Sequence, residues 1–71
     1  MILLLNPLLE GLEAARRAAA DAVNPNDEVT VDDQGDHWIF EFIPRGDAIG
    51  GGARVSVDKA DFRILRVIRS Q

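Results

Sequence analysis

The residues of this chain that could do chemistry are few and stand apart from one another. His37 is the single histidine, the chain has no cysteine, and no spaced pair of carboxylates accompanies His37 in the pattern of a metal site. Glu41 could act as a general acid or base if it were buried, but the sequence identifies no partner for it. We therefore interpret His37 and Glu41 as solvent-facing strand residues, and the sequence predicts no catalytic residue, no metal, no cofactor and no enzyme.

Three consecutive glycines, Gly50–Gly52, are the second candidate for chemistry. They lack the lysine and the following helix that a phosphate-binding loop requires, which argues against nucleotide binding. Glycine gives the backbone freedom and permits close approach to another surface. The run therefore predicts a loop between two strands, whose purpose is backbone freedom or close contact with a partner.

Charge is the more informative property of the sequence. Twelve acidic residues against eight basic ones give a net charge of −4, which disfavours nucleic acid as a partner. Residues 1–41 hold nine acids and two bases, whereas residues 42–71 hold three acids and six bases. The acidic half has two interpretations, a solvated face and a patch that steers a basic protein partner into place. On the second interpretation, the predicted partner-binding residues are Asp27, Glu28, Asp32, Asp33 and Asp36.

The element that must organise these residues is the predicted strand His37–Ile43. Alternate residues of a strand point to opposite faces, so Trp38, Phe40 and Phe42 share one face. Those three are most of the aromatic residues in the chain, and we expect them to form the floor of the core. We also expect Trp38 to be buried against a helix. The other face of the strand carries His37, Ile39, Glu41 and Ile43.

One helix is predicted before this strand, over residues 7–23. Asn6 is a favoured N-cap and Pro7 fits the first helical position. A residue that precedes proline avoids helical geometry, so Asn24-Pro25 should end the helix. The alanines on its inner stripe would let the helix approach a sheet closely. That predicted stripe consists of Leu8, Leu12, Ala15, Ala19, and Ala22 or Val23.

Residues 1–6 form an apolar tail before the helix. The run Met1–Leu5 is too short to span a bilayer, and it lacks the basic start and the cleavage site of a signal peptide. We expect it to pack on the core or on a second subunit and to have no role at a membrane. Together with the absence of cysteine, this predicts a cytoplasmic protein.

Further strands should flank the aromatic strand, so that residues 28–69 make a four-stranded sheet. Residues 28–32 and 53–57 alternate between apolar and polar types, and Asp33–Asp36 has the composition of a hairpin turn. Residues 62–69 do not alternate cleanly, which predicts a bulge or two buried faces. Expected inward-facing residues of the first two of these strands are Val29, Val31, Ala53, Val55 and Val57.

The predicted fold is therefore a single α+β domain over residues 1–71. One N-terminal helix packs on a four-stranded antiparallel meander, and the last strand is an edge of the sheet. An unpaired edge strand tends to find another strand. This edge and the apolar tail together predict a homodimer.

The second half of the chain also resembles a known family. The resemblance rests on Trp38–Phe42, Pro44, Gly50–Val55 and Val57–Lys59, and it covers about residues 36–68. These segments are similar to those of small bacterial immunity proteins with a nuclear-transport-factor-like, or cystatin-like, fold. The resemblance implies a protein that masks the surface of a toxin delivered between competing bacteria. The helix-then-meander order is also similar to PepSY-type and cystatin-like modules, which bind or inhibit proteases.

One position departs from the pattern of that family. Such proteins usually turn after Asp-Lys through Thr-Gly, whereas Asp61-Phe62 occupies those positions in this chain. Phenylalanine does not readily take the left-handed geometry that glycine allows. We therefore expect this turn to have a different backbone conformation.

These observations predict a protein-binding module, and the leading hypothesis is an immunity protein whose partner is a basic toxin. The alternatives are a structural homodimer and a protease-inhibitor-like module. A small-ligand binder or an enzyme would need a pocket between helix and sheet. An alanine-lined helix that packs closely leaves little volume for such a pocket.

Overall fold

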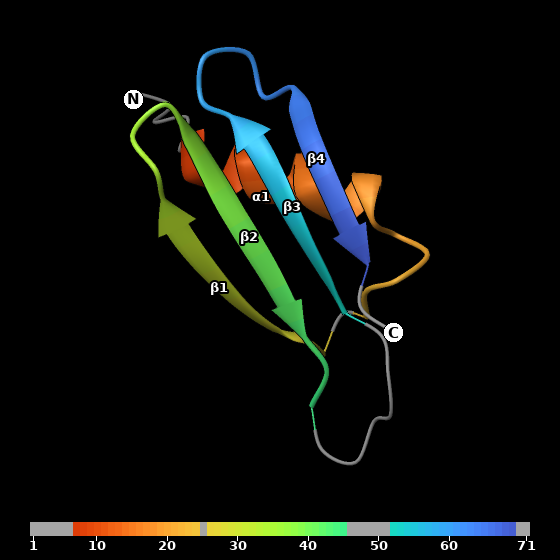
Figure 1. Ribbon diagram of the computed structural model, residues 1–71. Helices are drawn as coiled ribbons and strands as arrows, with labels where there is room; N and C mark the ends of the chain where they lie inside the picture. The colour runs from red at the N-terminus through yellow and green to blue at the C-terminus, as the bar shows by residue number, and fades with distance from the viewer. Residues whose placement is uncertain (1–6, 25, 46–51, 70–71) are drawn as a thin grey trace, which may run out of the picture.

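The structure, a computed structural model, describes residues 7–24, 26–45 and 52–69. The chain forms a helix α1 (Pro7–Ala18) and then strands β1 (Glu28–Asp33), β2 (His37–Ile43), β3 (Ala53–Asp58) and β4 (Ile64–Arg69). The strands pair antiparallel in the order β1-β2-β3-β4, as Figure 1 shows. The predicted α+β fold, one helix on a four-stranded meander, is confirmed. The apolar tail 1–6, Gly50 and Gly51 lie outside the described residues.

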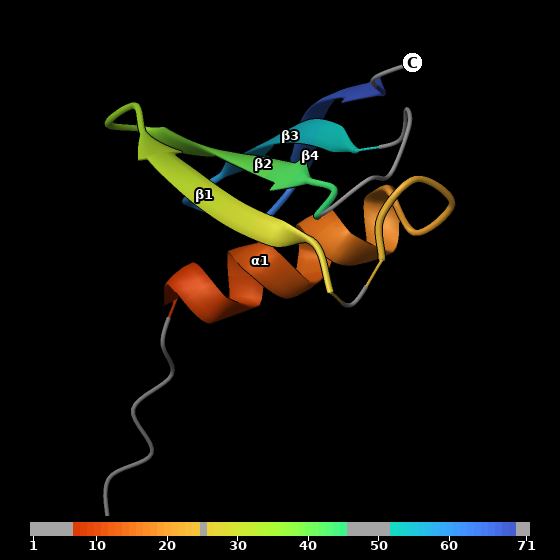
Figure 2. The same cartoon turned by 90° about the horizontal axis from the view of Figure 1, so that it is seen from below.

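The helix covers only one face of the sheet, and it covers that face unevenly. Figure 2 shows α1 on one side of the sheet and no helix or strand of the described residues on the other side. The helix packs against β2, β3 and β4 but does not approach β1. As a result, Val29 is half-buried whereas Val31, on the same face of β1, stays 46% exposed. Val31 does point to the predicted face of the sheet, but it is not buried because α1 does not extend over β1.

The aromatic strand β2 forms the floor of the core, as predicted. Trp38, Phe40 and Phe42 are buried, while the residues between them are exposed or half-exposed. Their neighbours in β3, Ala53, Val55 and Val57, are buried as well. The period-2 pattern of both strands therefore specifies which face meets the helix.

The helix is shorter than predicted. It starts at Pro7, as the Asn6-Pro7 signal indicates, but it ends at Ala18 and not at residue 23. Beyond it, the Ala22 N–H donates to the Ala19 carbonyl at 2.8 Å, a bond that spans three residues and tightens the chain into a turn. The Ala22 carbonyl then accepts the Gly52 N–H at 3.1 Å. This tertiary bond holds the chain after the helix against the start of β3.

The buried line on α1 differs from the predicted stripe. Gly11 and Ala15 of α1 and Ala19, just beyond its end, are buried and spaced four residues apart, whereas Leu8 is exposed and Leu12 only half-buried. Small residues on this line bring the helix backbone close to the sheet, as predicted from the alanines. The tightest contact is at Gly11, where an added Cβ would lie 2.7 Å from Cζ3 of Trp38.

The turn into β4 corrects an expectation of the sequence analysis. Phe62 adopts the left-handed conformation, φ 60°, that we expected this turn to avoid. Its ring lies nearly parallel to Trp38, with centroids 6.3 Å apart, and its N–H donates to the Asp58 carbonyl. These contacts offset the backbone strain, which is of the order of 1 kcal/mol for a non-glycine residue.

The irregular pattern of β4 comes from a bulge and not from two buried faces. The pairing passes from Ser56↔Arg66 to Val57↔Ile64, so Leu65 is the additional residue and is exposed. Ile64 and Val67 pack against the core on the helix side. At the far end of β4, the Arg69 guanidinium donates to both oxygens of Asp21 at 3.0 and 3.1 Å, which ties β4 to the turn after α1.

Candidate protein-binding face

The structure separates the five acids that we predicted as one patch. Asp27 is 8% exposed and therefore faces inward. Its Oδ2 accepts the Asn24 N–H at 2.9 Å, and its own N–H donates to the Asn24 carbonyl at 3.0 Å. This reciprocal pair closes the turn before β1. The Asp27 carboxylate is thus engaged within the chain.

Asp33 and Asp36 stabilise the end of the β1–β2 hairpin. Asp33 accepts the Lys59 ammonium at 2.6 Å and the Gly35 N–H at 2.9 Å, and the hydrogen bond from Lys59 is the main cause that lowers its pKa. Asp36 contacts Nδ1 of His37 at 2.6 Å, which lowers the pKa of Asp36. Both acids keep exposed carboxylates, but each already has a side-chain partner within the chain.

Glu28 and Asp32 lie on the face of the sheet that α1 leaves uncovered. Because β1 alternates, these two acids point away from the side of Val29 and Val31. We call this surface the helix-free face. It consists of Glu28, Thr30 and Asp32 from β1, His37, Ile39, Glu41 and Ile43 from β2, Arg54, Ser56 and Asp58 from β3, and Arg66 and Ile68 from β4.

Charge on the helix-free face is divided between its two halves. Glu28, Asp32 and Glu41 make the β1–β2 half acidic, and Arg54 and Arg66 make the β3–β4 half basic. At the boundary, Arg54 approaches Glu41 to 3.5 Å, a loose and exposed pair. The Asp58 carboxylate at the end of β3 accepts the Ala60 N–H at 2.7 Å. The face is therefore bipolar across the strands.

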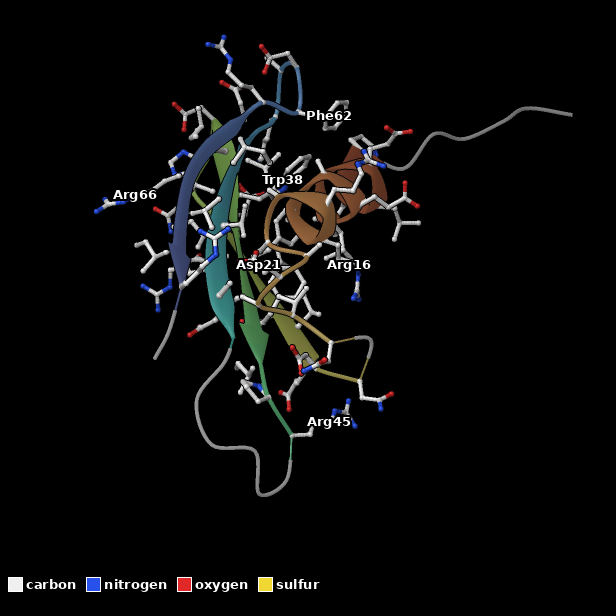
Figure 3. The ribbon with its side chains drawn as sticks, turned by 90° about the vertical axis from the view of Figure 1, so that its right-hand side faces the viewer. Arg16, Asp21, Trp38, Arg45, Phe62 and Arg66 are labelled. Carbon is white, nitrogen blue, oxygen red and sulfur yellow. The ribbon has the colours of Figure 1, made fainter. Side chains whose placement is uncertain are left out.

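Two of these charges have no partner within the described chain. The side chains of Glu28 and Arg66 make no hydrogen bond or ion pair among residues 7–24, 26–45 and 52–69. Figure 3 shows Arg66 on the side of the sheet opposite the helix, pointing into solvent. Within the same residues, the Asp32 carboxylate accepts a hydrogen bond only from the neutral side-chain amide of Gln34, at 2.7 Å. The opposite ends of the face thus carry charge that the chain itself does not neutralise.

Apolar side chains lie between the charged ones. Ile43 is 38% exposed, Ile68 is 43% exposed and Ile39 is half-buried. The solvent face of an antiparallel sheet is ordinarily polar. The three isoleucines therefore expose apolar area to water on this face, and a bound protein would remove that area from water. Contact of that kind supplies binding energy in protein interfaces.

The helix side of the molecule offers little for a small ligand. A shallow, open depression of about 330 Å³ lies beside the helix and is lined by Arg16, Ala20, Val23 and Asn24. The Arg16 guanidinium lies over the Phe42 ring, 5.6 Å from its centroid, and so is already in contact with the core. Within the described residues, no group of three acidic, histidine or cysteine side chains could hold a metal ion.

Comparisons of the chain with protein-family models, with curated proteins and with solved structures gave no match. The resemblance to immunity proteins therefore stays a prediction. Among the residues that the structure describes, no helix is long and apolar enough to cross a membrane.

The sequence pattern missed the basic half of the helix-free face. The sequence analysis counted Arg54 and Arg66 among the basic residues of the second half of the chain. Only the strand pairing shows that Arg54 lies beside Glu41 and that Arg66 lies beside Ser56. The signal that could have found them is the strand alternation. It assigns Arg54 to the face opposite Val55, and the meander order then puts it next to Glu41.

Proposed function

We propose that this chain is a protein-binding module, without an enzymatic activity of its own, and that the helix-free face is its binding surface. The observation that carries this proposal is the set of three isoleucines, Ile39, Ile43 and Ile68, left partly exposed among charged residues. Apolar area inside a charged surround is the usual composition of a protein interface. No comparable surface for a small ligand exists in the described part of the helix side.

The acidic half of this face suits a partner with a basic surface. Glu28, Asp32 and Glu41 share one half of this face, and their negative field would draw such a protein into register before apolar contact forms. Asp27 does not belong to the proposed surface because its carboxylate is buried. An immunity protein that masks a basic toxin would use a surface of this kind, and the absence of cysteine favours a cytoplasmic site of action.

Affinity capture with matched charge variants tests the proposal. The face variant Glu28→Lys/Asp32→Lys reverses two charges of the helix-free face, and the control Glu10→Lys/Glu13→Lys makes the same change on exposed helix positions. We expect wild type and control to capture a protein with a basic surface and the face variant to lose it. Binding of the purified partner should then slow as salt rises, because screening weakens the steering.

Equal capture by all three proteins would contradict the proposal, because binding would then not use the helix-free face. Circular dichroism of each variant checks that the fold is intact. Exposed substitutions of this kind usually change stability by less than about 0.5 kcal/mol.

A further inference from the structure

The charges of the helix-free face complement one another, and this points to a specific partner. We propose that two copies of this chain pack through their helix-free faces about a two-fold axis parallel to the strands. In this arrangement β1 of one copy lies over β4 of the second copy, and β2 lies over β3. The inference rests on the proposed function, because it names the partner of the face that we assign to protein binding.

Charge decides between the two limiting orientations of the axis. Identical sheets that pack face to face can be related by an axis across the strands or by one along them. An axis across the strands sets β1 over β1 and β4 over β4, which brings Asp32 near Asp32 and Arg66 near Arg66. An axis along the strands sets the acidic half of each copy over the basic half of the other. Opposite charges attract across an interface and like charges oppose it, so the second orientation is favoured.

The registers of the strands extend this match to individual residues. Pairing places Thr30, Glu41, Arg54 and Ile68 in one row across the sheet. An axis along the strands, midway between β2 and β3, lays this row over its own reverse. Glu41 then faces Arg54 of the second copy, and Thr30 faces Ile68 of the second copy.

The neighbouring row matches in the same way. It consists of Asp32, Ile39, Ser56 and Arg66. Reversal of this row sets Asp32 opposite Arg66 of the second copy and Ile39 opposite Ser56 of the second copy. In both rows an acid meets an arginine and a large isoleucine meets a small hydroxyl residue. Two sheets about 10 Å apart and turned by about 30° pack by interdigitation of this kind.

The size of the face predicts how tightly the copies associate. Four strands about 4.8 Å apart and six residues long, at about 3.3 Å each, give a flat area of roughly 400 Å² per copy. This is small beside the roughly 800 Å² per partner of a standard interface. We therefore expect a reversible dimer that depends on concentration and weakens as salt rises.

The decisive experiment uses two single charge reversals, Asp32→Arg and Arg66→Asp. In a dimer of the Asp32→Arg variant, both contacts set arginine against arginine, and in a dimer of the Arg66→Asp variant both set aspartate against aspartate. Each variant alone should dimerise at least about tenfold more weakly than wild type, since close charge pairs carry at least that much coupling. A mixture of the two should form a heterodimer, because one contact is then native and the other is the same pair reversed.

Sedimentation velocity from micromolar to millimolar concentration measures all of these species. Glu13→Arg, an exposed helix position, is the control for a charge change of the same size and should dimerise like wild type. Circular dichroism verifies that each variant is folded. A tagged copy of one variant identifies the heterodimer in the mixture.

Three results would overturn the inference. A wild-type chain that stays monomeric at millimolar concentration has no second copy as partner. A dimer that ignores both reversals uses another surface, such as a sheet edge. A heterodimer of wild type with Asp32→Arg that is tighter than the wild-type dimer has its axis across the strands, because Asp32 of one copy then meets the arginine that replaces Asp32 in the other. If the wild type is monomeric but the face variant loses a captured basic protein, the proposed function stands and only this inference fails. If wild type, control and face variant all capture the same protein equally, the proposed function itself fails.

Discussion

Gly11→Ala is a substitution in which two effects of known size oppose each other. Alanine favours a helix interior over glycine by about 1 kcal/mol, so at an exposed position the change would stabilise the protein. At Gly11, however, the new Cβ would lie 2.7 Å from Cζ3 and 2.8 Å from Cε3 of Trp38. Carbon atoms in good contact are about 3.5–4.0 Å apart, so the methyl group would be roughly 1 Å too close.

The Trp38 ring has little room to move away. Two rings pack against the Trp38 ring: the Phe62 centroid lies 6.3 Å from the Trp38 centroid, and the Phe40 centroid lies 6.0 Å from it. The Lys59 ammonium lies 5.5 Å from the Trp38 centroid. Overpacking of a filled core costs about 1–3 kcal/mol. With a rigid ring as the obstacle we take the upper part of that range, about 2–3 kcal/mol, and subtract the helix gain. The expected net effect is a loss of about 1–2 kcal/mol in the free energy of unfolding.

Urea denaturation followed by far-UV circular dichroism measures this loss, and a double-mutant cycle assigns its cause. In a Trp38→Phe background the colliding ring atoms are absent, so Gly11→Ala should be neutral or stabilising there. Ala14→Gly, at a half-exposed helix position, is the control that measures helix propensity in this helix and should cost about 1 kcal/mol. A Gly11→Ala protein more stable than wild type would refute the close approach of α1 to Trp38.

Three further predictions follow from the packing and the ion pairs. Trp38→Ala should lower the free energy of unfolding by about 3–5 kcal/mol, enough to unfold the domain. In the native protein, Trp38 should show blue-shifted fluorescence that moves to longer wavelength in urea. A native Trp38 that quenchers can reach would contradict its burial. Phe62→Gly should relieve about 1 kcal/mol of strain but lose more in burial and stacking, for a net loss of about 1–2 kcal/mol by urea denaturation; a gain in stability would show that the stacking contributes little. Hydrogen bonds from Arg69 and Lys59 lower the pKa of Asp21 and of Asp33 below their ordinary value of 3.8. The stability that these two ion pairs contribute is therefore present above that pH and is lost as the pH falls through the lowered pKa values. The variant Asp21→Asn/Asp33→Asn should flatten the loss of stability at acid pH, and an unchanged loss would place its origin elsewhere.

The sequence was sufficient for the fold because each element carries a local signal. Trp38, Phe40 and Phe42 alternate with polar or exposed neighbours, which fixes the buried face of β2 whatever the rest of the chain does. Asn6-Pro7 similarly marks the start of α1 without reference to tertiary contacts. Gly35, with φ 95°, meets the demand of the hairpin turn that the composition of Asp33–Asp36 predicted.

What the sequence could not supply depends on where elements lie relative to one another. The lateral position of α1 leaves Val31 uncovered and makes Gly11 the point of closest approach, and neither follows from periodicity. The tertiary bond from Gly52 to Ala22, which holds the chain after α1 against the start of β3, has no local signal either. For the candidate face, charge counting grouped Asp27 with Asp32, although one is buried in a turn and the other lies on the sheet.

The lateral position of α1 also has a consequence for the motions of the protein. Strand β1 pairs with β2 alone and has no helix above it, so the hairpin bonds and the burial of Val29 hold it in place. Strands with few buried contacts open at lower free energy than the rest of a domain. Amide protons of β1 that bond to β2 should therefore exchange with solvent faster than those shared by β2 and β3. The strand that carries Glu28 and Asp32 would then be the one whose exchange slows most when a partner covers the helix-free face.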